Sequence, residues 1–141
     1  MKKNIVLVMV AWLISIVSNI SVSFFYPDTN ISVFNLVVSI LFLIVIGYSV
    51  FNFIRQQNFR IVLYIGVIGA VSGLLVSLFE SMNSAQFITL PLYVLVITPL
   101  FGLNYLMNLN IALFSLAMLF IFIPIILLQL YFKRKEYSYP R

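Results

Sequence analysis

The chain alternates long, charge-free apolar runs with short polar or basic turns. A helix of about 20 apolar residues spans the ~30 Å hydrocarbon core of a bilayer. Because lipid offers a backbone no hydrogen-bond partner, runs of this length are predicted to be transmembrane α-helices. The runs that meet the requirement are residues 5–25, 33–54, 61–79 and 111–132.

Two short turns join the first three runs. Pro27, Asp28 and the residues after them have the composition of a turn, and Asn30 or Ser32 is placed to cap the second run. A basic loop from Arg55 to Arg60 leads into the third run. Connections this short place consecutive helices side by side and antiparallel.

The stretch 88–108 is the ambiguous part of the chain. No charged residue occurs between Glu80 and Lys133, which leaves room for two spans. However, the apolar part from Leu90 to Leu103 has only about 14 residues, too few for a full crossing, and two prolines and a glycine interrupt it. We therefore expect a re-entrant or interfacial segment at the outer face.

The placement of charges favours this interpretation. With four spans and a cytoplasmic N-terminus, all 8 basic residues lie on the cytoplasmic side, whereas Asp28 and Glu80 lie outside. A fifth span would separate the basic residues into two groups on opposite sides, against the positive-inside rule. The C-terminus is then cytoplasmic as well. The basic residues are Lys2, Lys3, Arg55, Arg60, Lys133, Arg134, Lys135 and Arg141.

The first run also has the pattern of a secretory signal, because Lys2 and Lys3 precede an apolar core. Cleavage after small residues near Ser23 would remove it. We favour an uncleaved span, because the run is long enough to cross and the sequence after it is membrane protein throughout.

Composition supports an integral membrane protein. Hydrophobic residues make up 64% of the chain and charged residues 8%, with a mean hydropathy of +1.19. We predict an all-α, four-transmembrane-helix bundle, residues 1–141 forming one membrane domain in a cell (plasma) membrane. The many Ile, Phe, Asn and Lys residues are typical of AT-rich bacterial genomes. The net charge of +5 indicates contact with anionic lipid, not nucleic acid.

The inventory of reactive side chains is short. The chain has no Cys and no His, so disulfides, Cys/His zinc sites and Ser-His or Cys-His catalysis are excluded. Its three acidic residues lie far apart in the sequence. We therefore expect no enzyme activity, no metal site and no cofactor. Glu80, at the end of a span, is either a candidate functional acid or an interfacial residue.

The third run carries a stripe of small residues. At ~100° per residue they fall within one arc of roughly 100°, which lets another helix approach closely. The partner is either a helix of the same chain, which is the commoner case, or a helix of a second protein. A ridge of Ala11, Ser15 and Ser18 in the first run is a plausible partner. The stripe consists of Gly66, Gly69, Ala70, Gly73 and Ser77.

Function is predicted by elimination. We expect a protein that acts through helix–helix contacts, as an accessory, assembly or protective (immunity- or stress-type) component of a membrane complex. Its partners would be the bilayer and another membrane protein or further copies of itself. Lys133, Arg134 and Lys135 are expected to contact lipid headgroups. The alternative is an oligomeric channel or small-solute transporter with a path lined by Ser and Asn, although these side chains are more often used between helices.

Overall fold

The computed structural model describes residues 2–81 and 86–138, and the regular elements within them are all helical. The predicted all-α architecture is therefore confirmed for this part of the chain. Five stretches are long and apolar enough to cross a membrane. Four of them match the predicted runs to within a few residues, the first ending at Phe24 and not at residue 25, and the fifth is Thr89–Met107. Length and composition alone therefore do not select four spans.

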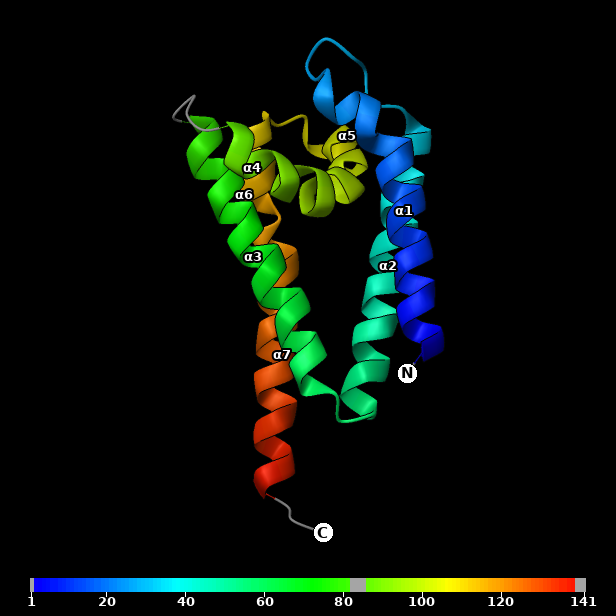
Figure 1. The fold of residues 1–141 in the computed structure, drawn as a ribbon, viewed down its shortest axis with the longest axis vertical. Coiled ribbons are helices and arrows are strands. Elements are labelled where there is room, and N and C mark those ends of the chain that lie inside the picture. The colour runs from blue at the N-terminus through cyan, green and yellow to red at the C-terminus, as the bar shows by residue number, and fades with distance from the viewer. Residues whose placement is uncertain (1, 82–85, 139–141) are drawn as a thin grey trace.

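Four long rods form the body of the molecule (Figure 1). The fourth rod consists of two helices that stack end to end, with the Met118 amide donating to the Phe114 carbonyl and the Phe122 amide to the Met118 carbonyl across the junction. The helices are α1 (Lys2–Phe24), α2 (Val33–Arg55), α3 (Phe59–Ser81), α6 (Ile111–Ala117) and α7 (Leu119–Ser138).

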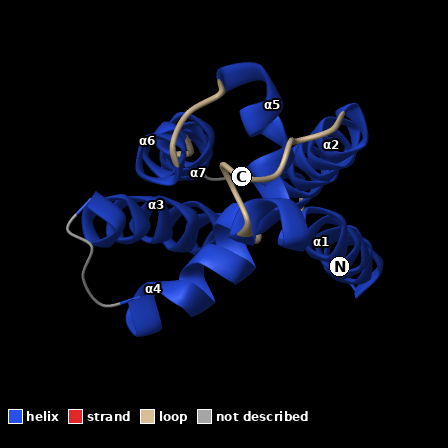
Figure 2. Cartoon of the chain, turned by 90° about the horizontal axis from the view of Figure 1, so that it is seen from above, coloured by secondary structure: helices blue, strands red, loops and turns tan. Residues whose placement is uncertain are grey.

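Residues 86–107 form a different kind of element, which we call the lateral segment. It lies across one end of the rods and does not run alongside them (Figures 1 and 2). Its geometry changes from α-helix to π-helix to a 3-10 helix and back to one α turn. The parts are α4 (Gln86–Leu92), η1 (Tyr93–Ile97), η2 (Thr98–Leu103) and α5 (Asn104–Met107).

Local sequence explains the hairpins. At the start of α2, Ser32 accepts a hydrogen bond from the Asn35 amide while the Asn35 side chain accepts one from the Ser32 amide, so the predicted cap is confirmed. Between α2 and α3 the chain reverses within three residues, with Gln57 at a positive φ of 59°. These turns pair α1 with α2 and bring α3 back toward the opposite end.

The rods form two antiparallel pairs. α1 packs on α2, and α3 packs on α6 and α7, with Gly73 beside Ser115 and Gly66 beside Ile126. The two pairs meet near the α2–α3 turn and are bridged at the other end by the lateral segment (Figure 1). The two pairs are therefore joined at both ends, by the α2–α3 turn at one and by the lateral segment at the other.

The core extends from the lateral segment to the α2–α3 turn, where Phe53 and Val62 are buried. Half of the Thr89–Met107 stretch is buried, against 11% of the α1 stretch, so the segment is the most enclosed part of the chain. Phe101 is fully buried and makes edge-to-face ring contacts with Tyr26, Tyr93 and Phe114. Packing of the segment thus ties both rod pairs together.

Candidate functional site

Side chains of α1 and α2 hold the lateral segment by hydrogen bonds to its backbone. The Pro99 carbonyl accepts from the Ser15 hydroxyl at 2.6 Å, the Ser39 hydroxyl at 2.9 Å and the Asn19 amide at 3.4 Å. All three donors are completely buried. In a setting without water these bonds give the broken backbone the partners that a regular helix would have supplied.

Gly102 lies one turn further along and is fitted to α2. Its amide donates to the Ser39 hydroxyl at 3.1 Å, so Ser39 bonds both backbone groups. A Cβ at Gly102 would overlap the backbone oxygen of Asn35. Only glycine allows this approach without a backbone shift. The Asn35 side chain donates to the Ser18 carbonyl at 2.7 Å and ties α2 to α1 behind it.

Trp12 supplies a further bond at mid-helix. Its indole nitrogen donates to the Leu95 carbonyl at 2.7 Å. In a regular α-helix the amide of residue 99 would donate a hydrogen bond to that carbonyl, but Pro99 has no N–H. The single tryptophan of the chain therefore donates to a carbonyl that the proline leaves without its usual backbone donor.

The last turn of α1 completes the contact. The Tyr93 hydroxyl donates to the Ser23 carbonyl at 2.8 Å, and the Ser23 and Thr98 hydroxyls lie 3.3 Å apart. We call this whole contact between the lateral segment and the α1–α2 pair the polar seam. On the α1–α2 side it consists of Trp12, Ser15, Asn19, Ser23, Asn35 and Ser39.

The stripe of small residues forms the second contact, which we call the glycine seam. A Cβ on Gly73 would lie 2.8 Å from the Ser115 carbonyl oxygen, and a Cβ on Gly69 would overlap the Phe122 ring. The stripe therefore faces α6 and α7 of the same chain. Ala70 and Ser77, its other members, are half-buried.

The proposed pairing of this stripe with the ridge of α1 was wrong. Ser15 of that ridge bonds to Pro99, and Ser18 bonds through its carbonyl to Asn35. The α1 ridge is thus taken up by α2 and the lateral segment. A stripe of small residues predicts that another helix packs closely against it, but does not identify that helix.

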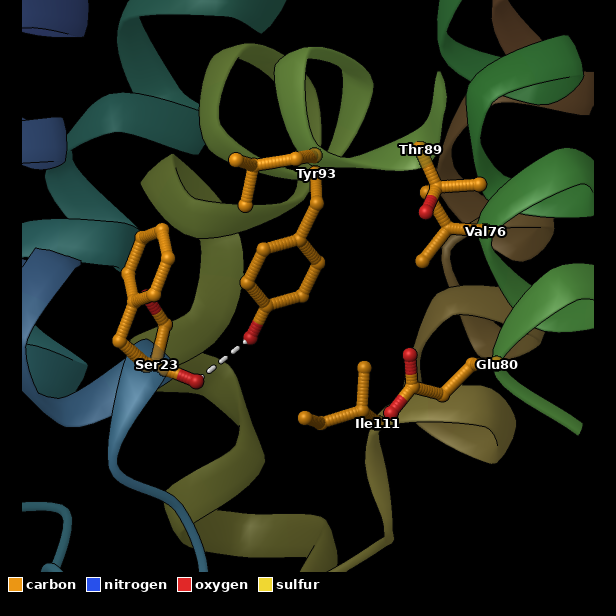
Figure 3. A pocket seen from close by; sticks show the side chains of 8 residues that line it. Ser23, Val76, Glu80, Thr89, Tyr93 and Ile111 are labelled. Atoms are coloured by element: carbon orange, nitrogen blue, oxygen red, sulfur yellow. Dashed lines mark hydrogen bonds between the residues drawn. The ribbon is translucent and has the colours of Figure 1, made fainter. Parts of the chain in front are cut away.

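Glu80 lines a pocket of about 250 Å³ near the end of α3. Figure 3 shows its carboxylate and the Tyr93 ring on different walls of this pocket, which we call the Glu80 pocket. Glu80 itself is exposed. A carboxylate and a hydroxyl at one opening can bind a cation or a hydrogen-bond donor. The remaining lining residues are Ser23, Phe24, Val76, Thr89, Leu90 and Ile111.

A larger cavity of about 420 Å³ lies between the two rod pairs and under the lateral segment. Its walls are almost wholly apolar, and its size falls within the range of small-molecule sites. We call it the apolar cleft. Its lining comes from α1, α2, α3, α7 and the lateral segment, and includes Trp12, Ile46, Ser49, Ile61, Tyr64, Ile65, Ile68, Leu95 and Leu100.

The basic end of the molecule lies opposite the lateral segment. Lys133, Arg134 and Lys135 continue α7 beyond the predicted run, as exposed residues on a helix that reaches Ser138. The starts of α1 and α3 and the end of α2 lie at the same end of the rods (Figure 1). Arg141, the remaining basic residue of the tail, is outside the described residues.

Sequence analysis missed the residues that hold the segment. Pro99 and Gly102 count there only as interruptions of an apolar stretch, and Trp12 is not singled out. The signal that could have identified them is the Pro-x-x-Gly spacing next to two helices with buried-face Ser and Asn. Such a pattern indicates exposed backbone groups together with side chains able to bond them.

No protein-family model, curated protein or solved structure matches this chain. Its function is therefore argued from its own geometry. Four features bear on it: the lateral segment with its polar seam, the Glu80 pocket, the apolar cleft and the basic end.

Proposed function

We propose that the protein crosses a cell (plasma) membrane four times with both termini in the cytoplasm, and that the lateral segment re-enters the outer half of the bilayer. We propose further that it has no catalytic role and acts by contact, as an accessory, assembly or protective component of a membrane complex. The surface for that contact is the exposed part of the lateral segment.

The distribution of charge along the rods supports the orientation. Lys3, Arg55, Arg60 and the cluster starting at Lys133 lie at one end, and Glu80 lies at the other (Figure 1). The positive-inside rule assigns the first end to the cytoplasm. The lateral segment begins and ends near the same end of the rods, as a re-entrant element does (Figure 1).

Labelling of single cysteines tests this orientation, and the natural chain contains no cysteine that would interfere. Asn30 and Asn108 are exposed beyond the outer ends of the rods, and Gln56 is exposed in the α2–α3 turn. We expect a membrane-impermeant maleimide added to intact cells to label Asn30→Cys and Asn108→Cys but not Gln56→Cys. Labelling of Asn30→Cys without Asn108→Cys would indicate a fifth crossing and contradict the proposal.

One observation carries the functional proposal. The lateral segment has no charge, is fixed by the polar seam, and still leaves Leu106 69% exposed, with Tyr105 and Met107 exposed beside it. A rigid apolar surface loses little conformational freedom when a partner binds it, which favours affinity. This surface lies at the rim of the fold, where a neighbouring membrane protein can reach it.

The alternative of a channel or transporter has less support. The Ser and Asn side chains that could line a path bond to the lateral segment and to each other: Asn19 donates to Ser39 at 3.1 Å, and both contact the Pro99 carbonyl. Side chains used in this way hold helices together. A path would therefore need a lining from several copies of the chain.

Site-specific photocrosslinking in cells tests the proposed contact. A photoreactive residue at Leu106 is compared with one at Phe120, which is 85% exposed on α7 and remote from the segment. We expect a discrete protein adduct at Leu106 and lipid adducts at Phe120. The adduct should disappear when Gly102→Ala displaces the segment.

Two results would count against this function. Identical adducts at both positions would show that Leu106 is an ordinary lipid-facing residue. An adduct at Leu106 with a second, differently tagged copy of the chain would favour the oligomeric channel or transporter, which flux measurements in liposomes would then examine.

A further inference from the structure

The apolar cleft extends from the lateral segment toward the start of α3. Leu92, Leu95 and Leu100 form its wall at the segment end, and Ile61 lies at the other end, which we call its mouth. The α3 residues that line it run from Ile61 to Gly69, about 12 Å of helix. That length is close to one leaflet's share of a ~30 Å hydrocarbon core. A transmembrane helix of a partner would need the full thickness, so the cleft is too short for one.

Basic charge marks the mouth of the cleft. Arg60 is exposed and lies one helical turn before Tyr64, which lines the cleft, so the two side chains share a face of α3. Of the acidic residues, Asp28 and Glu80 lie at the opposite end of the rods, and Glu136 lies at this end, in α7 directly after Lys135 (Figure 1). Basic residues thus outnumber acidic ones at the mouth of the cleft, and the exposed Arg60 can meet an anionic group there.

One polar atom inside the cleft lacks a partner. Ser49 lines the cleft and is fully buried, and its hydroxyl has no hydrogen-bond partner in the described structure. Buried hydroxyls in proteins are nearly always bonded, so an unbonded one in a cavity wall indicates a missing acceptor. An ester carbonyl of a bound lipid would supply that acceptor.

We propose that the apolar cleft binds one anionic phospholipid of the cytoplasmic leaflet. The acyl chain fills the cleft up to the lateral segment, an ester carbonyl accepts from Ser49, and the phosphate lies against Arg60. The proposal goes beyond the outer contact at Leu106 and does not depend on it. It uses the four-span orientation only to name the leaflet.

Native mass spectrometry of the protein purified in mild detergent from membranes of phosphatidylethanolamine and phosphatidylglycerol tests the proposal. We expect one retained phospholipid per chain, identified as phosphatidylglycerol by fragmentation. Ile65→Trp, which fills the cleft, should abolish retention. Val17→Trp adds the same ring at a position that is 73% exposed on α1, and should retain the lipid.

A second pair of variants tests the headgroup. Arg60→Gln should keep a lipid in the cleft but lower the preference for phosphatidylglycerol about five-fold, the change that corresponds to ~1 kcal/mol for one basic residue near an anionic surface. Arg55→Gln removes a charge at the same end but outside the cleft mouth and should leave the preference unchanged. Because both positions are exposed, these variants keep the test valid even if Ile65→Trp fails to fold.

Three results would overturn the inference. The first is equal retention by wild type and a folded Ile65→Trp variant. The second is a retained lipid with no preference between the two headgroups. The third is a stoichiometric polypeptide, in place of lipid, that is lost on Ile65→Trp. The photocrosslink at Leu106 is measured separately, so failure here leaves the outer contact to stand or fall by itself.

Discussion

The polar seam and the glycine seam join helices within the same fold by opposite means. At the polar seam, a broken helix exposes the Pro99 carbonyl and the Gly102 amide, and buried Ser and Asn side chains bond them. At the glycine seam, two regular helices come so close that a Cβ on Gly73 would lie 2.8 Å from a facing carbonyl oxygen. There the Ser115 hydroxyl is buried with no partner.

The difference shows what each seam is for. Regular helices satisfy their own backbones, so α3 and α7 need only close packing to associate in lipid. An irregular segment cannot be buried in an apolar setting until its free backbone groups are bonded. The polar seam therefore allows the irregular lateral segment to be buried, and the glycine seam allows the helices of one rod pair to pack closely.

The largest loss of stability is expected at Gly102, where the polar seam brings the lateral segment into close backbone contact with α2. Gly102→Ala should destabilise the fold by about 3 kcal/mol, the upper part of the range for overpacking, because the new methyl group overlaps a backbone oxygen and not a mobile side chain. Thermal unfolding in detergent measures the change. Gly47→Ala, where nothing lies within 4 Å of the new methyl group, is the control. Equal stability of the two variants would mean that the segment is not seated as described.

A smaller effect is expected in the glycine seam. Gly73→Ala should cost about 2 kcal/mol, because two otherwise regular helices can separate slightly to accept the methyl group. The variant should keep both rod pairs and lose stability only. Val67→Leu, on the exposed face of the same helix, should change little. Unfolding midpoints that coincide for the two variants would remove the packing role of the stripe.

Hydroxyl deletion distinguishes the seams directly. Ser39→Ala removes the group that bonds Pro99 and Gly102 and should cost on the order of 1 kcal/mol. Ser115→Ala removes an equally buried hydroxyl that bonds nothing and should leave stability unchanged or slightly higher. If both changes cost the same, the hydrogen bonds of the polar seam contribute nothing specific.

The smallest effect is expected outside both seams. Glu80→Gln should change the unfolding midpoint by less than the equivalent of ~0.5 kcal/mol, since the residue is exposed. A collapse of the folded yield would instead show that the carboxylate is paired structurally. The comparison with Ser39→Ala, made in the same detergent, sets the scale for what counts as small.

Sequence analysis predicted what depends on local pattern. Charge-free runs of sufficient length indicated helices, and the Ser32–Asn35 spacing indicated the start of α2. The short apolar stretch with Pro91 and Pro99 indicated an element unlike its neighbours. These inferences need only periodicity, length and the missing N–H of proline, which are properties of the chain itself.

Partner identity could not be predicted in the same way. The arc of Gly66, Gly69 and Gly73 fits any helix, and nothing in it distinguishes α7 from the ridge of Ser15, which bonds to the lateral segment instead. The bonds to Pro99 join residues 60 to 84 positions apart. The apolar cleft is defined by the gap between two rod pairs, and no single stretch of the sequence encodes that gap.

The lateral segment also gives the molecule unequal ends. One end holds four rods and a segment laid across them, and the other end holds only the rods (Figure 1). In the topology proposed above, the protein has a larger cross-section in one half of the bilayer and displaces more lipid area from that leaflet. A body with this taper is accommodated with least strain where the membrane is convex toward its wide end. Under that topology we expect membrane curvature to influence where the protein gathers.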